Sequence, residues 1–193
     1  MKKLFVIIGL IVALAAGFYF GYWTKTPAYA AGEIQQALQK KDLQLFKERV
    51  NMEKVYSYAI DDILDELKAD NLPEHKIAAA IVKGLKQEII TELIHRTESS
   101  FEMETRQSKS FLDDPVESIT AYAGSAALSM TDVLNVEEQG NSAIVKVKIH
   151  DKDLNKDFIW HVQMEKDING SWTAVRVLNL KEYLKERKDL SIK

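Results

Sequence analysis

The pattern of hydrophobic and polar positions divides the chain into three consecutive parts. Residues 4–23 carry no charged side chain, and at about 1.5 Å of helix per residue they are long enough to cross a hydrocarbon core of about 30 Å. From Pro27 onward apolar residues recur every three or four positions, which is typical of amphipathic helices. From Ser129 onward apolar and polar residues alternate, which is typical of strands with one buried face. The pattern therefore predicts an N-terminal transmembrane anchor over 1–23, a helical part over 26–124 and a sheet part over 129–180.

Residues that cap helices mark where the first helices begin. Thr26 and Pro27 suit an N-cap and a first helical position, and they predict a helix over 27–40. Asp42 predicts a short second helix, and Asn51 predicts a longer third one. The third helix has an apolar stripe of Met52, Val55, Tyr56, Ala59, Ile60, Ile63, Leu64 and Leu67, opposite a polar face of Asp61, Asp62, Asp65, Glu66 and Lys68.

Pro73 restarts the helical pattern and predicts one helix that runs to about Arg96. Its predicted inward face is formed by Ile77, Ile81, Leu85, Ile89 and Leu93. Gly84 inside this helix costs about 1 kcal/mol relative to alanine, which indicates a close packing contact. The polar residues that follow predict a frayed helix end and a mobile loop over about 98–114. A further helix is predicted from Pro115, with Val116, Ile119 and Tyr122 on its apolar face.

Turn signals divide the alternating region into four strands. They are Gln139-Gly140-Asn141, Lys152 to Asn155, and Asn169-Gly170, and the last is a strong hairpin signal. The connections are too short for parallel crossovers, so we expect an antiparallel meander. The predicted inward positions are Ala143, Val145, Val147 and Ile149 on one strand and Phe158, Trp160, Val162 and Met164 on the next. Residues 181–189 predict a C-terminal helix with Tyr183 and Leu184 facing the core.

This order of elements predicts an α+β domain over 24–193, in which a helical layer covers one face of a four-stranded antiparallel sheet. The formal net charge is −3 and the charges are interspersed, which argues against nucleic-acid binding. The chain has no cysteine, so disulfides, thiolate chemistry and cysteine-held metals are excluded. No cofactor is predicted.

The segment TKTPAYAAGE (24–33) has two incompatible interpretations. Ala28-Tyr29-Ala30 has the form of a signal-peptidase site, whereas Thr26-Pro27 has the form of a helix start. The apolar region of a signal peptide spans about 7–15 residues, which is shorter than the run over 4–23, so an uncleaved anchor is favoured. Lys2 and Lys3 precede the run and predict a cytoplasmic N-terminus with the domain on the other side.

Small residues follow one face of the predicted anchor. Gly9, Ala13, Gly17 and Gly21 recur every four positions, so a second helix could approach closely there, and a homodimer through this stripe is a hypothesis. The alternative is that Gly and Ala are simply common in membrane helices.

Residues that could carry chemistry are few. Glu88, Glu92 and His95 could share a helix face, and Glu92 and His95 form Glu-x-x-His, half of a di-metal carboxylate motif. Only one copy occurs, so an exposed polar face is the favoured interpretation. Tyr122, Trp160, Met164 and Trp172 could line a cleft for an apolar ligand, or they could be ordinary core. Because neither a phosphate-binding loop nor a nucleophile elbow occurs, we predict no enzyme.

The start of the domain resembles a known family. Trp23, Thr26-Pro27, Ile34, Ala37-Leu38, Asp42, Phe46 and Val50-Asn51 are similar to the opening of the bacterial family called domain of unknown function 2939. The order of elements resembles the cystatin-like, nuclear-transport-factor-2-like superfold. The resemblance implies an extracytoplasmic domain on the bacterial cytoplasmic membrane and supplies no activity.

These observations lead us to expect a non-enzymatic binding or assembly module for an unknown envelope protein. One alternative is a carrier of a small apolar ligand in the cleft between helices and sheet. The other is a small acid–base enzyme, which would need a buried carboxylate with a raised pKa in that cleft.

Overall fold

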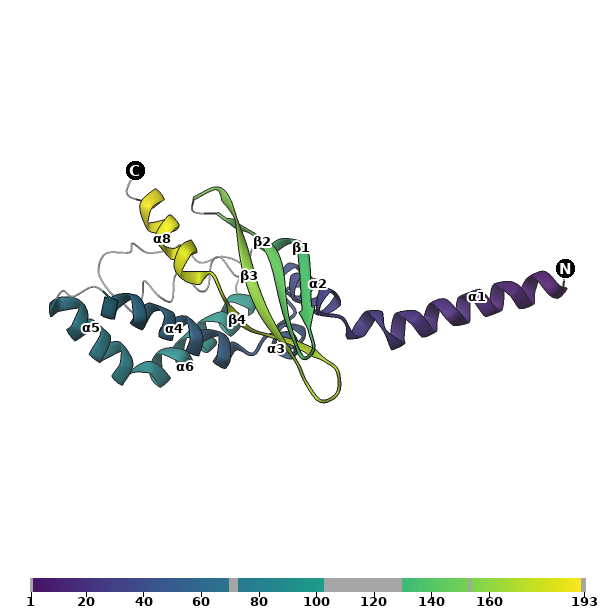
Figure 1. The fold of residues 1–193 in the computed structure, drawn as a ribbon, viewed down its shortest axis with the longest axis horizontal. Coiled ribbons are helices and arrows are strands. Elements are labelled where there is room, and N and C mark those ends of the chain that lie inside the picture. Colours follow the sequence, from purple (N-terminus) through teal and green to yellow (C-terminus); the bar gives the residue numbers. More distant parts are fainter. Residues whose placement is uncertain (1, 70–72, 103–129, 153, 192–193) are drawn as a thin grey trace.

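A single apolar helix leads into the folded domain. In the computed structural model, which describes residues 2–69, 73–102, 130–152 and 154–191, α1 (Lys2–Gly21) projects away from the other elements (Figure 1). The window Ile7–Lys25 is long and apolar enough to cross a membrane, and none of it is buried. These properties are shared by spanning anchors and signal sequences. A short 3₁₀ turn, η1 (Trp23–Lys25), joins α1 to the domain.

The predicted caps begin the helices that follow. The bounds are α2 Pro27–Lys40, α3 Leu43–Arg49, α4 Met52–Ala69, α5 Pro73–Gly84, α6 Lys86–Glu102 and α8 Leu180–Ser191. The Thr26 hydroxyl accepts from the backbone N–H of Tyr29 at 3.2 Å. The Asp42 carboxylate accepts from Leu45, and the Asn51 side chain from Lys54, each at 3.0 Å. Each cap pairs an N–H group that the first helical turn leaves without a partner.

The sheet is the predicted antiparallel meander. Its strands are β1 (Met130–Gln139), β2 (Ser142–Asp151), β3 (Lys156–Lys166) and β4 (Trp172–Val177), in the spatial order β1-β2-β3-β4. Along β2 the predicted inward residues are buried, from Ala143 to Ile149 at alternate positions. Two hairpin turns use glycine with positive φ, Gly140 at 63° and Gly170 at 83°, which side chains with a Cβ rarely adopt. The α+β layout is confirmed.

The helical layer packs on the inner face of this sheet and forms one core with it. On α4 the buried residues Met52, Tyr56, Ile60 and Leu64 follow each other at intervals of four, as the apolar stripe predicts. They share a hydrophobic cluster with the inward residues of β2 and β3. At the other end of the domain α8 packs through Tyr183, whose ring meets those of Phe158 at 4.9 Å and Trp160 at 5.4 Å between centroids.

The link between α3 and α4 lies against the outer edge of the sheet. Val50 forms an isolated parallel bridge with Ala174 of β4. The backbone N–H of Asn51 donates to the carbonyl oxygen of Ala174 at 2.9 Å. The helical half and the last strand are thus joined by backbone hydrogen bonding as well as by packing.

The prediction of one helix from Pro73 to about Arg96 is wrong. The segment breaks at Leu85 into α5 and α6, which diverge from each other in Figure 1. The break changes which side faces inward, since Ala79 and Val82 are buried on α5 whereas the predicted inward residues Ile77, Ile81 and Leu85 are 64%, 55% and 44% exposed. On α6 the prediction is confirmed, because Ile89 and Leu93 are buried.

The predicted packing contact at Gly84 is also wrong. No atom lies within 4 Å of the position that a Cβ would take there. Gly84 is instead the last residue of α5, where a residue that weakens helices is easily tolerated.

The segment predicted as a frayed end and loop begins as regular helix. α6 continues to Glu102, and Thr97 and Phe101 are both buried on it. Phe101 packs against Phe46 of α3 with ring centroids 5.0 Å apart. The rest of the predicted loop, 103–114, lies outside the described residues, as does the predicted helix from Pro115 with Val116, Ile119 and Tyr122.

Candidate functional site

A cavity of about 130 Å³ lies between α2, α3 and α4 on one side and the inner face of the sheet on the other. Its deep wall is formed by buried side chains, among them Ile34, Met52, Val145 and Met164. The cavity forms because the helices that cover the curved sheet carry small residues such as Ala31 and Ala59 at positions that face it. An engineered apolar cavity of about 150 Å³ stays dry and binds benzene, so this space suits a small apolar group.

The cavity approaches the surface between α4 and the end of the sheet. Val55 and Ala59 of α4 are only half-buried, and so are Val177 of β4 and Leu180 of α8. The lining residues of α2 are buried. A ligand would therefore enter on the side of α4, β4 and α8.

Two of the residues that line the cavity carry a buried N–H group without an acceptor. The indole N–H of Trp160 and the Nε–H of Arg176 are buried and make no hydrogen bond, and both residues line the cavity. An unpaired buried donor costs about 1–3 kcal/mol. A ligand that carried an accepting oxygen would remove that cost.

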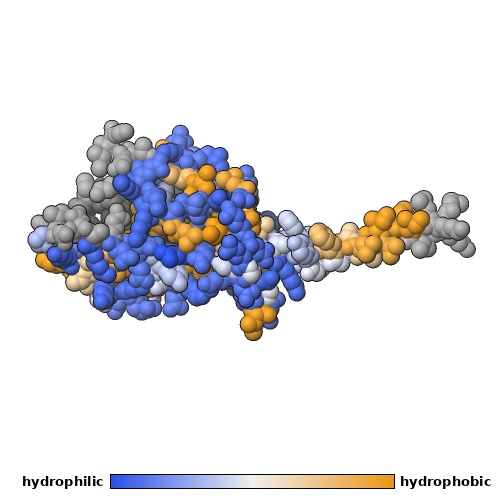
Figure 2. All heavy atoms as spheres, viewed as in Figure 1, coloured by the Kyte–Doolittle hydropathy of each residue, from blue (hydrophilic) through white to orange (hydrophobic). Residues whose placement is uncertain are grey.

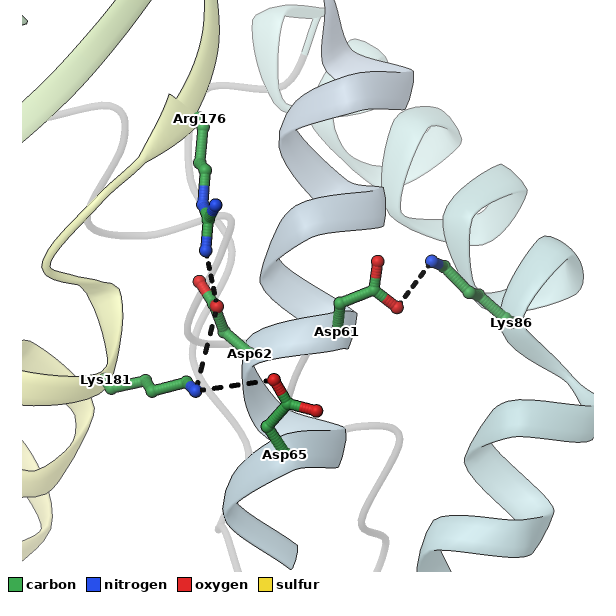
Figure 3. Close-up of polar contacts among 6 residues, drawn as sticks. All are labelled: Asp61, Asp62, Asp65, Lys86, Arg176 and Lys181. Atoms are coloured by element: carbon green, nitrogen blue, oxygen red, sulfur yellow. Dashed lines mark hydrogen bonds and ion pairs between the residues drawn. The ribbon is translucent and has the colours of Figure 1, made fainter. Parts of the chain in front are cut away.

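Arg176 is held in place at the entrance by an acidic partner (Figure 3). Its Nη2 lies 2.8 Å from Oδ1 of Asp62, and its guanidinium lies 4.9 Å from the centre of the Tyr58 ring. Lys181 of α8 approaches the same Asp62 oxygen at 3.9 Å and Asp65 at 3.8 Å. This cluster joins α4, β4 and α8 around the entrance.

The cluster corrects one prediction. The pattern places Asp62 on the polar, outward side of α4, yet Asp62 is 5% exposed. Its neighbour Asp61 follows the prediction, since it is exposed and pairs with Lys86 of α6 at 2.7 Å. Asp62 is buried because β4 and α8 pack against that flank of α4, a contact between segments far apart in the sequence.

The second buried carboxylate among the described residues has a structural role. Asp151, at the end of β2, accepts a hydrogen bond from the hydroxyl of Tyr183 at 2.9 Å and one from the backbone N–H of Leu154 at 3.2 Å. It thereby closes the β2–β3 turn and fixes α8. Neither Asp62 nor Asp151 lines the cavity.

The predicted cleft residues divide into three groups. Trp160 and Met164 line the cavity. Trp172 does not, because its indole N–H donates to the backbone oxygen of Lys25 at 3.0 Å and its ring belongs to the core next to η1. Tyr122 lies outside the described residues.

Sequence reasoning missed Arg176 as a cavity residue. The β3–β4 register shifts between Gln163 and Met164, so Val175 has no counterpart on β3. At such a bulge one extra residue enters the strand, so the alternation of inward and outward side chains shifts by one position. The bulge has no clear sequence signal, because Val175 is as good a strand residue as its neighbours.

The Glu92-x-x-His95 pattern forms part of an exposed helix face, as favoured. Glu92 pairs with Arg96 at 2.6 Å. Within the described ranges no group of three or more His, Asp or Glu side chains is arranged to hold a metal ion.

One histidine has an acidic partner on the outer face of the sheet. Nδ1 of His150 lies 2.8 Å from Asp157, and Lys148 lies 2.7 Å from the same carboxylate. Hydrogen bonds from Lys148 and then His150 lower the pKa of Asp157. All three side chains are substantially exposed, so the group is a solvated ion cluster on the face opposite the cavity.

The small-residue stripe of α1 is free of packing contacts with the rest of the described chain. Gly9, Ala13, Gly17 and Gly21 are exposed, and no atom lies within 4 Å of a Cβ position at the three glycines. The homodimer through this stripe stays a prediction.

Comparisons of the chain with protein-family models, with curated proteins and with solved structures find no match.

Proposed function

We propose that this protein is a membrane-anchored, non-enzymatic binding module whose cavity takes a small amphiphile. The ligand places an apolar group of up to about the size of benzene between helices and sheet, and an accepting oxygen reaches the donors of Trp160 and Arg176. The observation that carries the proposal is that two residues lining an otherwise apolar cavity, Trp160 and Arg176, each carry a buried N–H group without a partner.

The chemistry of the lining favours binding over catalysis. An acid–base enzyme needs a carboxylate next to the bound substrate, and the two buried carboxylates of the described chain are engaged by Arg176 and Tyr183 instead. Arg176 itself stays charged at any physiological pH and is a poor proton donor. It suits the recognition of a carboxylate or carbonyl oxygen.

We base the proposed location on the apolar helix α1 and on the sequence resemblance to domain of unknown function 2939. α1 has the length and composition of a single span. Lys2 and Lys3 on its N-terminal flank support a cytoplasmic N-terminus and an extracytoplasmic domain on the bacterial cytoplasmic membrane. The amphiphile would then be met on the outer side of that membrane.

A fluorescence titration tests the proposal. Trp160 lines the cavity and Trp172 does not, so bromohexanoate added to the full chain in lipid nanodiscs should quench Trp160 and leave Trp172 unaffected. The measurement uses a Trp23→Phe background and subtracts the signal of a Trp160→Phe variant. Hexanoate and hexanol, which both carry an accepting oxygen, should compete for the site, and hexane should compete less well.

A cavity-filling substitution provides the control. Ala59→Leu fills space that the ligand needs, so it should abolish the quenching while the protein remains folded by circular dichroism. Ala80→Leu makes the same change on the exposed side of α5 and should leave the titration unchanged. Quenching that persists in Ala59→Leu, or that affects both tryptophans equally, would refute ligand binding in the cavity.

A role in assembly is a second candidate, carried by the exposed apolar residues Ile77 and Ile81 of α5 and Leu85 directly after it. Three apolar side chains spaced by four form a continuous ridge of the kind that packs against a partner helix. A photo-crosslinking residue at Ile81 should give a discrete crosslinked product in cells, and one at Lys76 on the same helix should not. Equal products from both positions would indicate random collision.

A further inference from the structure

The turn between β3 and β4 exposes an apolar side chain, that of Ile168, although several hydrogen bonds order the turn. Asp167 and Ser171 close the turn through a backbone hydrogen bond of 2.8 Å, and Gly170 donates to the Asp167 carbonyl at 3.0 Å. The Asp167 carboxylate accepts from the N–H groups of Asn169 and Ser171, both at 2.8 Å. Ile168, within this turn, is 101% exposed. Turn positions normally carry small or polar residues.

This turn lies beside the exit of the anchor. Cδ of Lys25 is 3.7 Å from the position that a Cβ would take on Gly170. Trp172, which follows the turn, donates its indole N–H to the Lys25 carbonyl at 3.0 Å, and the ammonium of Lys166 lies 5.4 Å from the centre of its ring. Figure 1 shows that the β3–β4 hairpin ends on the side of the domain from which α1 leaves, and Figure 2 shows hydrophobic atoms at its tip.

The position of Lys25 fixes the depth of the turn relative to a bilayer. Tyr22 and Trp23 end the apolar segment and are 63% and 43% exposed, and such rings favour the level of the lipid headgroups. Lys25 follows within two residues, so the turn beside it lies at about the same level. An exposed isoleucine in a turn that has Lys166 at its start and Lys25 beside its Gly170 suits an interfacial membrane contact.

We propose that the Asp167–Ser171 turn is a second membrane contact, in which Ile168 inserts among the lipid headgroups while Lys25 and Lys166 approach phosphates. The inference rests on the membrane anchoring in the proposed function. Lipid is the occupant because the end of α1 and the turn are joined through Lys25, so a bilayer that contains α1 begins close to the turn that carries Ile168. Two contacts fix the tilt of the domain, whereas α1 alone leaves it free.

Labelling at a single cysteine tests this contact, since the chain has no cysteine of its own. Full-length Ile168→Cys carrying an environment-sensitive fluorophore is reconstituted in vesicles of phosphatidylcholine with a minority of phosphatidylglycerol. Doxyl-labelled lipid should quench it severalfold more than the same label on Ile77→Cys, an exposed isoleucine on α5. Iodide in the buffer should quench the label on Ile77→Cys more strongly than the label on Ile168→Cys.

Flotation of the same vesicles separates the two proposals. If the protein floats with the vesicles and the label at Ile168 is quenched by iodide but not by doxyl lipid, the anchor stands and the turn contact is wrong. If the protein does not float, the anchoring fails and the turn contact fails with it. An Ile168→Asp variant should still float, and its domain should show faster reorientation by fluorescence anisotropy than that of the parent chain.

Discussion

The indole N–H of Trp172 donates to the backbone oxygen of Lys25 across 3.0 Å, and so joins the last strand of the sheet to the residue just beyond the apolar segment. Trp172 is 1% exposed, so the backbone oxygen of Lys25 supplies the hydrogen-bond acceptor for an indole N–H that is buried. The folded domain therefore begins at Lys25, before α2.

This contact predicts the N-terminus of the mature protein. Cleavage after Ala30 would remove the Lys25 acceptor, the Thr26 cap and the buried Pro27. The unpaired indole N–H alone would cost about 1–3 kcal/mol. We expect intact-mass measurement of the membrane fraction to show a chain that retains Lys25. A chain that starts at Ala31 would overturn the interpretation of α1 as an uncleaved anchor.

Two adjacent aspartates should differ in their effect on stability. Asp62→Asn leaves Arg176 partly buried without its carboxylate, and we expect a loss of roughly 2 kcal/mol, below the range for fully buried pairs because Arg176 is 32% exposed. Asp61→Asn removes an exposed pair with Lys86 and should cost less than about 1 kcal/mol. Urea unfolding of the two variants measures the difference. Equal losses would show that Arg176 does not depend on Asp62.

Alkaline pH should destabilise the fold through Tyr56. Burial raises the pKa of this hydroxyl above its ordinary value, although its hydrogen bond with Thr97 opposes the shift. The unfolded chain then ionises first, so the contribution to stability is present below about pH 10 and is lost as pH rises toward the folded value. Urea midpoints between neutral pH and pH 11 should fall less steeply for Tyr56→Phe than for the parent chain. Urea midpoints that fall equally steeply with pH in both chains would contradict a role for Tyr56 in this loss of stability.

Two glycines should respond in opposite ways to alanine. Gly84 has negative φ and open space around it, so Gly84→Ala should stabilise α5 by about 0.5–1 kcal/mol. Gly170 has a φ of 83°, so Gly170→Ala should cost about 1–2 kcal/mol through backbone strain. Thermal unfolding of both variants checks the sign. A destabilised Gly84→Ala would mean that the break before α6 needs glycine itself.

The elements with local signals were predictable from the sequence. Thr26, Asp42 and Asn51 each cap the helix that they predict, because a capping bond forms within four residues of the chain. The β2 strand alternates cleanly because one face meets the helices and the other meets water. Such features need no knowledge of distant partners.

The elements that depend on distant partners were not predictable in the same way. Asp62 is buried by β4 and α8, which follow it by more than a hundred residues. The inward faces of α5 and α6 differ because the helix breaks at Leu85, and continuous apolar spacing hides that break. Half of the predicted cleft, Trp160 and Met164, lines the cavity, whereas the indole of Trp172 is turned toward Lys25, to which it donates a hydrogen bond.

The parallel contact between Val50 and Ala174 also limits aggregation. β4 is an edge strand, and an edge with free N–H and C=O groups is a template on which another chain can add a strand. The N–H of Asn51 occupies the Ala174 carbonyl, and at the opposite edge β1 is irregular near Asp132 and carries Glu137 and Glu138. Each edge thus carries a feature that hinders the addition of a further strand, and such features would matter most for molecules held together on a surface and diffusing in two dimensions.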